Sequence, residues 1–214
     1  MTTDVDIANM ALTKLGTRAT IASLTENSTE ARVINTWYAT VRDDLIRSVD
    51  WNFARVYQTL ALQGTPPARW AYSYAYPSDC VKFWRIDMGI TTWFPGDPNT
   101  IFEVGSDGTN RQIWTNQGTA TGVYSQRVTD PNRMDPEFVT AFVACLAAAV
   151  AYPITQKRDI AAQMQADAKA IMEDAMADSA NEAVSNDRDR VAETISARGY
   201  DYSYAPSWLN GKLY

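Results

Sequence analysis

The sequence predicts an α+β fold, an antiparallel helical bundle of about four helices with an inserted small antiparallel β-sheet and an extended C-terminal tail. Three observations predict it. Apolar residues recur with the 3.6-residue period of a helix in four segments. Short strand-like segments, separated by Gly, Pro and Asp-Gly turns, lie between the second and third of them. We therefore expect residues 1–55 and 130–180 to form the helical bundle, 56–129 the β-sheet region and 181–214 the tail.

The longest amphipathic segment runs from Ser28 to Asp50, and we expect the other elements to pack on it. Ser28 or Thr29 is its expected N-cap. One helical face carries its apolar residues: Val33, Ile34, Trp37, Tyr38, Val41, Leu45, Ile46 and Val49. The other face carries charged residues: Glu30, Arg32, Arg42, Asp43, Asp44 and Arg47. The pattern therefore places Trp37 in the core and Arg42 in solvent.

A shorter helix is predicted before it, over Asp4–Leu15, with Asp4 as N-cap and Gly16 as the C-terminal stop. Residues 17–27 form a polar loop, in which Ile21 and Leu24 are expected to fold back on the core. After the long helix, Trp51 and Phe53 begin an aromatic corner.

The middle of the chain predicts five or six short antiparallel strands. The segments are Val56–Leu62, Tyr72–Tyr76, Cys80–Asp87, Ile101–Val104, Gln112–Thr115 and Thr119–Val128. Cys80–Asp87 has the strongest alternation, which puts Val81, Phe83 and Arg85 on one face and Lys82, Trp84 and Ile86 on the other. Ser106-Asp107-Gly108 is a good hairpin turn. Residues 88–100 form a Gly- and Pro-rich loop that carries Trp93 and Phe94.

Two more helices follow. Asp135 is the expected cap of the third helix, Pro136 its first residue and Pro153 its end. The apolar run within it is rich in alanine and short for a membrane span, so we interpret it as a core helix. The fourth helix covers Arg158–Ala180, and the link is short enough to predict an antiparallel pair. Its inward side should carry Ile160, Met164, Ala168, Ile171 and Ala175.

Composition argues against several classes of function. The net charge of −6 argues against a nucleic-acid partner wrapped by charge neutralisation. An acidic wall would let DNA slide past it; the alternative is that mild acidity only aids solubility. The chain has no histidine, which excludes Ser-His-Asp and Cys-His triads and His-ligated metals. Cys80 and Cys145 lie in different segments without a CxxC pattern, and we interpret them as buried free thiols.

No catalytic template fits either. The chain has no phosphate-binding glycine loop and no nucleophile elbow. The acidic pairs Asp43-Asp44 and Glu173-Asp174 are adjacent in sequence, so their side chains diverge by about 100° on a helix. We therefore expect a protein that is not an enzyme, with no catalytic residues, no cofactor and no metal.

Two groups of aromatic residues lie where no core is expected. One crowds into the tail: Tyr200, Tyr202, Tyr204, Trp208, Leu209 and Tyr214. The other is Trp93 and Phe94 in the 88–100 loop. Exposed tyrosine and tryptophan mark protein interfaces, because they bury a large area with few rotatable bonds. Both groups are therefore predicted partner-binding residues; the alternative for the tail is that it folds back on its own domain.

The order of these features resembles the head-to-tail adaptors of tailed phages, the family of tail tubular protein A. The opening IANMALTKLGTRATIASLTENSTEARVINTWYATVRDDLIRSVDWNFA has a short helix ending in LG, a loop with SLTE and a long helix ending in W-x-F. YAYPSDCVKFWRI matches a tyrosine-proline strand entry, and a hairpin and two helices follow. The resemblance covers Ile7 to Ala180 as a pattern; the tail is not matched residue by residue.

The resemblance implies a structural virion protein of the neck and tail, assembled in the host cytoplasm. Such adaptors form a ring of twelve subunits between the portal protein and the tail nozzle protein. DNA passes through the ring without sequence-specific binding, and no membrane is involved. The helices form the ring body, the sheet faces the next tail component, bound here by Trp93 and Phe94, and the tail reaches the portal or a neighbouring subunit. The alternative is a monomeric binding module or assembly factor that docks through its aromatic tail.

Overall fold

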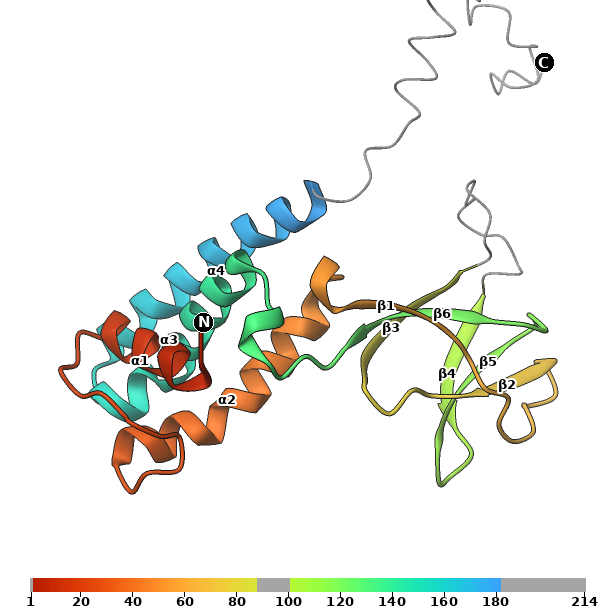
Figure 1. Cartoon of the computed structure of the whole chain (residues 1–214), viewed down its shortest axis with the longest axis horizontal. Coiled ribbons are helices and arrows are strands. Elements are labelled where there is room, and N and C mark those ends of the chain that lie inside the picture. The colour runs from red at the N-terminus through yellow and green to blue at the C-terminus, as the bar shows by residue number, and fades with distance from the viewer. Residues whose placement is uncertain (1, 88–100, 182–214) are drawn as a thin grey trace, which may run out of the picture. The chain divides into compact units, whose positions relative to one another are not determined.

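The computed structural model describes residues 2–87 and 101–181, and these contain four α-helices and two small antiparallel sheets (Figure 1). The predicted α+β class is confirmed. The prediction of one inserted sheet is wrong, because the strands form two sheets of three. The predicted tail and the 88–100 loop lie outside the described residues.

Helix α1 (Asp4–Lys14) begins one residue earlier than an Asp4 cap would require. Thr3 is the N-cap, and its hydroxyl accepts the Asp6 N–H while the Asp6 carboxylate accepts the Thr3 N–H at 2.8 Å. Because Thr3 and Asp6 form this reciprocal capping box, Thr3 takes the N-cap position and Asp4 becomes the first helical residue. Gly16 ends the helix as predicted, with a positive φ of 70° that glycine adopts without strain.

The loop after α1 folds back on the core as predicted. Ile21 is 4% exposed, and Leu24 packs against the same cluster. The Asn9 side chain holds Ile21 in place, since its amide donates to the Ile21 carbonyl at 3.0 Å and its oxygen accepts the Ile21 N–H at 2.9 Å. One α1 side chain thus replaces the strand partner that this loop segment lacks.

Helix α2 (Thr29–Ser48) starts at the predicted cap, where the Ser28 hydroxyl accepts the Ala31 N–H. Its buried residues are Ala31, Ile34, Tyr38, Arg42, Leu45 and Ile46. The prediction for Trp37 is wrong, because its side chain is 42% exposed. Trp37 is turned about 100° from Tyr38 and lies beyond the strip that the neighbouring helices cover. The prediction for Arg42 is also wrong, since it is only 8% exposed.

Helix α3 (Pro136–Thr155) has Asp135 at its N-cap and Pro136 at its first position, as predicted. Pro153 does not end it, because a proline in the last turn removes only its own hydrogen bond. The helix ends instead at Gln156, which adopts a left-handed conformation and donates its N–H to the Tyr152 carbonyl.

Helix α4 (Arg158–Asn181) follows α3 after two residues, Gln156 and Lys157. All five residues predicted for its inward side are buried or half-buried, with Ala168 and Ala175 the most enclosed. The last turns of α4 lie beside the first turn of α3, where Asp174 and Asp178 line a groove with Pro136 and Glu137.

The predicted aromatic corner forms the centre of the helical core. Trp51 and Phe53 both pack on Phe138 of α3, with ring centroids 5.1 and 4.8 Å apart, and Tyr38 packs edge-on against Phe142 at 4.9 Å. Trp51 is 1% exposed, and its indole N–H donates to the Leu45 carbonyl at 2.8 Å. Edge-to-face contacts of this kind add to the stabilisation that burial gives.

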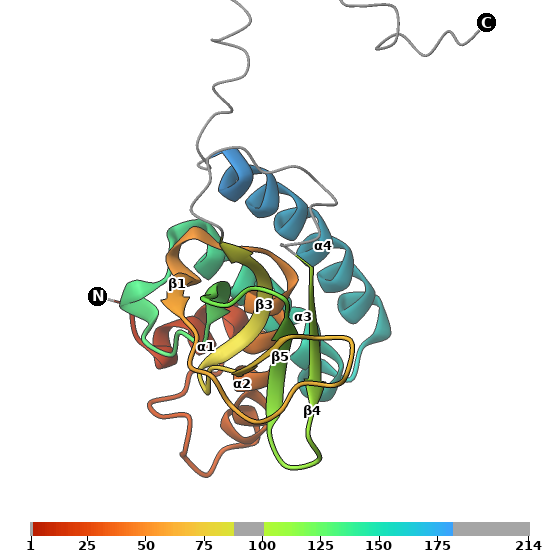
Figure 2. The same cartoon turned by 90° about the vertical axis from the view of Figure 1, so that its right-hand side faces the viewer.

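Strands β1 (Arg55–Thr59), β6 (Thr121–Gln126) and β3 (Cys80–Asp87) form the first sheet, in the order β1-β6-β3. Strands β2 (Tyr72–Ala75), β5 (Arg111–Thr115) and β4 (Phe102–Ser106) form the second, in the order β2-β5-β4. Strands β5 and β4 run side by side in Figure 2. The chain after β1 joins them, because the Leu60 N–H donates to Ala120 in the first sheet and Ala61 accepts from Ala75 in the second. Side chains alone join the other edges, through Phe83 on Phe102 at 4.9 Å.

The face prediction for β3 is wrong in its second half. Arg85 is exposed whereas Ile86 is 2% exposed. Register shifts against β6 occur between Cys80 and Lys82 and between Phe83 and Arg85. Such an irregularity breaks the two-residue period, so Ile86 turns inward and Arg85 outward. The hairpin between β4 and β5 is as predicted, with the Asp107 carboxylate accepting the Thr109 and Asn110 N–H groups.

Three side chains on one face of α2 hold the helices to the first sheet. Asp43, Arg47 and Asp50 are spaced by four and three residues, so they line one stripe. Asp43 accepts from Arg127 after β6 at 2.8 Å, and Arg47 donates to the Val81 carbonyl of β3 at 2.9 Å. Asp50 accepts from Arg55 of β1 at 3.0 Å. The joint between helices and sheet therefore combines these polar contacts with apolar packing, since Val81 of β3 and Val128 after β6 belong to the helical core cluster.

We expect Trp51→Ala to lower the free energy of unfolding by about 3–5 kcal/mol, the usual cost of emptying a buried tryptophan site. Trp37→Ala is the matched control and should cost less than about 1 kcal/mol, because the side chain is largely outside the core. Urea denaturation at low protein concentration measures both. Equal losses in the two variants would contradict the core described above.

Asp43→Ala should cost about 2–3 kcal/mol, because it leaves the buried Arg42 guanidinium without the carboxylate that both its Nε and Nη2 contact at 2.9 and 2.8 Å. Asp44→Ala, one residue on, is exposed and should stay within about 0.5 kcal/mol of the parent chain. Thermal unfolding of the two variants checks the difference, and a loss at Asp44 as large as at Asp43 would refute it.

Candidate interaction surface

All the predicted partner-binding residues lie outside the described part of the chain. Trp93 and Phe94 fall in residues 88–100, and the tail group from Tyr200 to Tyr214 falls in residues 182–214. The structure does describe the points from which the loop starts and returns. Asp87 pairs with Thr121 at the end of β3, and the Thr115 hydroxyl donates to the Ile101 carbonyl at 3.1 Å. The loop is therefore carried by backbone that is fixed at both ends.

Several other aromatic residues of the sheet region take part in local packing. Trp70 is 8% exposed, and its indole N–H donates to the Glu103 carboxylate at 3.0 Å. The Trp114 ring lies over Gly105, and its N–H donates to the buried Gln112 side chain at 3.0 Å. These tryptophans close the face of the second sheet that points away from its core and do not form an exposed aromatic patch.

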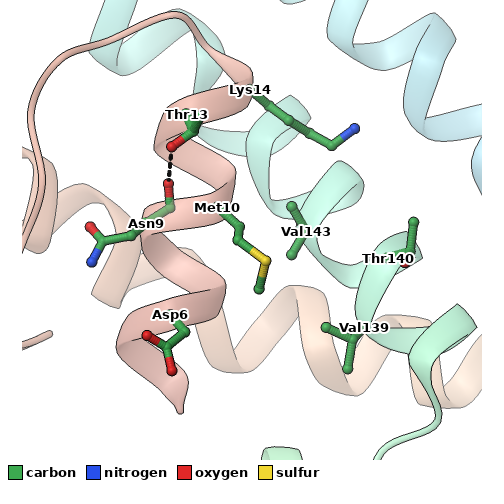
Figure 3. A pocket seen from close by; sticks show the side chains of 8 residues that line it. All are labelled: Asp6, Asn9, Met10, Thr13, Lys14, Val139, Thr140 and Val143. Atoms are coloured by element: carbon green, nitrogen blue, oxygen red, sulfur yellow. Dashed lines mark hydrogen bonds between the residues drawn. The ribbon is translucent and has the colours of Figure 1, made fainter. Parts of the chain in front are cut away.

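The largest groove that we describe runs between α1 and α3 and has a volume of about 530 Å³. Met10 reaches across from α1 towards Val139 and Val143 of α3, and these three side chains form its apolar floor (Figure 3). Its polar lining is Asp6, Asn9, Thr13, Lys14 and Thr140. Met10 is 40% exposed, so an apolar residue lies open in a concave surface.

Trp37 is the residue of functional interest that sequence reasoning missed. The helical period assigned it to the core together with Tyr38, although the two side chains point in different directions. Val33 and Val41, one turn before and after it, are half-buried, so Trp37 stands at the centre of an apolar stripe along α2. A signal was present in the sequence, because the apolar residues of α2 span a wider arc than packing on two helices requires.

Several ionisable groups in the described residues are held in ion pairs or buried. Asp43 pairs with two arginines, and no group of three Cys, Asp or Glu in residues 2–87 and 101–181 could hold a metal ion. Burial raises the pKa of the Cys80 thiol to about 11, and burial also raises the pKa of Cys145. Such thiols carry little thiolate at neutral pH and are poor nucleophiles. Both cysteines are free, as predicted.

Helix α3 is long and apolar enough to cross a membrane by length and composition alone. Buried core helices pass the same test, and half of its apolar stretch is buried inside this protein. Its Phe138 and Phe142 face Trp51 and Tyr38 in the helical core.

Neither a scan against protein-family models nor a search of curated proteins finds a match to this chain. The functional argument therefore rests on the residues themselves and on the surfaces they form.

Proposed function

We propose that this protein is a structural virion protein, a head-to-tail adaptor that forms a ring between the portal and the tail nozzle around the DNA channel. In this proposal the four helices pack as an antiparallel bundle and form the ring body, and the sheet region faces the next tail component. The tail from residue 181 reaches the portal protein. The ring has twelve subunits in the adaptors that the chain resembles, and DNA passes through without sequence-specific contacts.

The observation that carries the proposal is the order of elements from α1 to α4. The motifs that carry the resemblance have structural roles in this chain. Gly16 of the LG motif ends α1, and Glu26 of SLTE accepts the Ala22 N–H at 2.7 Å. The Ser28 hydroxyl, which caps α2, also donates to Glu26 and lowers the pKa of that carboxyl. Trp51 and Phe53 of W-x-F pack on Phe138. These motifs stabilise the fold and carry no chemistry. Motifs of this kind are what we expect in a protein that functions by assembling with other proteins.

The alternative is a monomeric binding module or assembly factor that docks through its aromatic tail. The two proposals differ in mass, because only an adaptor forms a closed ring. Native mass spectrometry of the purified chain, alone and with the portal protein, separates them, and electron micrographs of the complex would show the ring directly. A one-to-one complex that stays monomeric at every concentration would favour the alternative.

Truncation before Arg198 should leave a folded protein that no longer joins the portal stably. Each aromatic that is fully buried at such a contact can contribute roughly 1.5–3 kcal/mol, and a ring presents many tails at once. From Gly199 onward only Asp201 and Lys212 carry charged side chains, so the intact contact should also resist salt. Co-sedimentation with the portal at rising salt measures this, and a salt-resistant complex of the truncated chain would remove the tail from the mechanism.

Replacing both Trp93 and Phe94 by serine should leave the melting temperature of the isolated chain unchanged and block addition of the next tail component. The reason is that aromatic residues that bind a partner contribute to that interface and little to the stability of the free chain. Tyr57→Ser is a suitable control, since Tyr57 is 55% exposed on β1. Unfolding of the double variant would show instead that the loop packs on its own sheet.

A further inference from the structure

The geometry points to a specific contact between two copies of this chain: Trp37 on α2 of one copy inserts into the α1–α3 groove of the next. The inference rests on the proposed ring and names the surfaces that would make it. The occupant of the groove is thus a second copy of the same protein.

The first observation is that Trp37 is both exposed and rigidly presented. It lies in the middle of a 20-residue helix, and its 42% exposure leaves much of an indole ring in water. Val33 and Val41 flank it at one turn on either side and are only half-buried. Tryptophan on a regular element is the residue most enriched at energetically dominant interface positions. A partner that covers Trp37 would also complete the burial of the two valines.

The second observation is a complementary cavity on the same molecule. The α1–α3 groove has an apolar floor of Met10, Val139 and Val143 and a volume of about 530 Å³ (Figure 3). Sites that enclose a small organic group fall in the range of about 300–1,000 Å³. Methionine is unbranched and adapts to the shape of an aromatic partner, with a favourable sulfur–ring contact. The groove therefore suits an indole.

The third observation is that the knob, Trp37, and the groove are different surfaces of the molecule. Trp37 lies on an exposed part of α2, whereas the groove lies between α1 and α3. Helix α2 packs on α3 through Tyr38 against Phe142, a residue that does not line the groove. A contact between two different patches is head-to-tail, and repetition of it gives a closed ring when the rotation fits.

Charge at the edge of the two surfaces is also complementary. Lys14 lines the groove, and Asp44 follows Trp37 by two turns of α2. Both are exposed, and neither forms an ion pair with any residue that the structure describes. An ion pair between Lys14 and Asp44 at the rim would determine the orientation of the contact and add little to its affinity.

Two single variants test the contact from its two sides. Trp37→Ser removes the knob, and Thr140→Arg fills the groove of an otherwise intact chain. Each variant alone should lose ring assembly by about tenfold or more at a fixed concentration, as for a dominant interface residue. When the two variants are mixed, they should form pairs and no larger species. The Thr140→Arg chain still carries Trp37, and the Trp37→Ser chain still carries an open groove, so one contact forms between them and no second contact can follow. Native mass spectrometry reads the species directly, and circular dichroism checks that each variant is folded.

Tyr152→Ser is the matched control, because Tyr152 is 50% exposed on α3 and does not line the groove. It should assemble as the parent chain does. Rings of undiminished stability from Trp37→Ser or Thr140→Arg would overturn the inference and leave the proposed function standing. A parent chain that stays monomeric with and without the portal would overturn both.

Disulfide trapping gives an independent readout. In a chain that carries both Trp37→Cys and Met10→Cys, oxidation should give a ladder of linked copies, whereas either substitution alone should give none. The parent chain controls for Cys80 and Cys145, which are buried and half-buried. Dimers from Trp37→Cys alone would instead mean a two-fold contact between like surfaces and would exclude the head-to-tail arrangement.

Discussion

The structure depends on helix α2, which packs against the helical core and also binds the first sheet. Helix α2 buries Tyr38 and Leu45 against the helical core, and on another face it holds the first sheet through Asp43, Arg47 and Asp50. Apolar contacts alone would let the first sheet shift along α2. Hydrogen bonds are directional, so those from α2 to β1, β3 and the end of β6 allow one arrangement of the helix and the sheet. The same helix therefore contributes side chains to the core and fixes the orientation of the sheet region.

The sheet region carries both ends of the segment 88–100, since β3 ends at Asp87 and β4 begins at Phe102. Its two sheets are joined through backbone from Leu60 to Gln63 and through a shared cluster of side chains that includes Phe83 and Phe102. Strands β3 and β4, which flank residues 88–100, are thus the outer strands of their sheets. Such edges are suited to contact with another protein, because the backbone N–H and C=O groups on their outer sides are not bonded to a further strand among the described residues.

The proposed assembly would explain why Trp37 and Met10 are left uncovered. A chain that worked alone would lose solubility and gain nothing from an exposed Trp37 on a helix or an open Met10 in a groove. In a ring each copy covers the surfaces of its neighbours, so the same residues stabilise the assembly. The proposed adaptor function and the proposed contact therefore account for the features that the fold of one copy does not use.

The sequence by itself determined the elements, because caps, periods and turns are local. Ser28, Gly16, Pro136 and the Asp107-Gly108 turn each mark a boundary within a few residues of themselves, and the inward residues of α4 follow from spacing alone. Tertiary structure decided which part of each apolar face is covered. Trp37 and Arg42 exchanged their expected places because burial on α2 depends on where α1, α3 and the sheet lie, and a β-strand irregularity at Phe83 turned Ile86 inward. The split into two sheets depends likewise on contacts between segments far apart in the chain, for which a single sequence has no local signal.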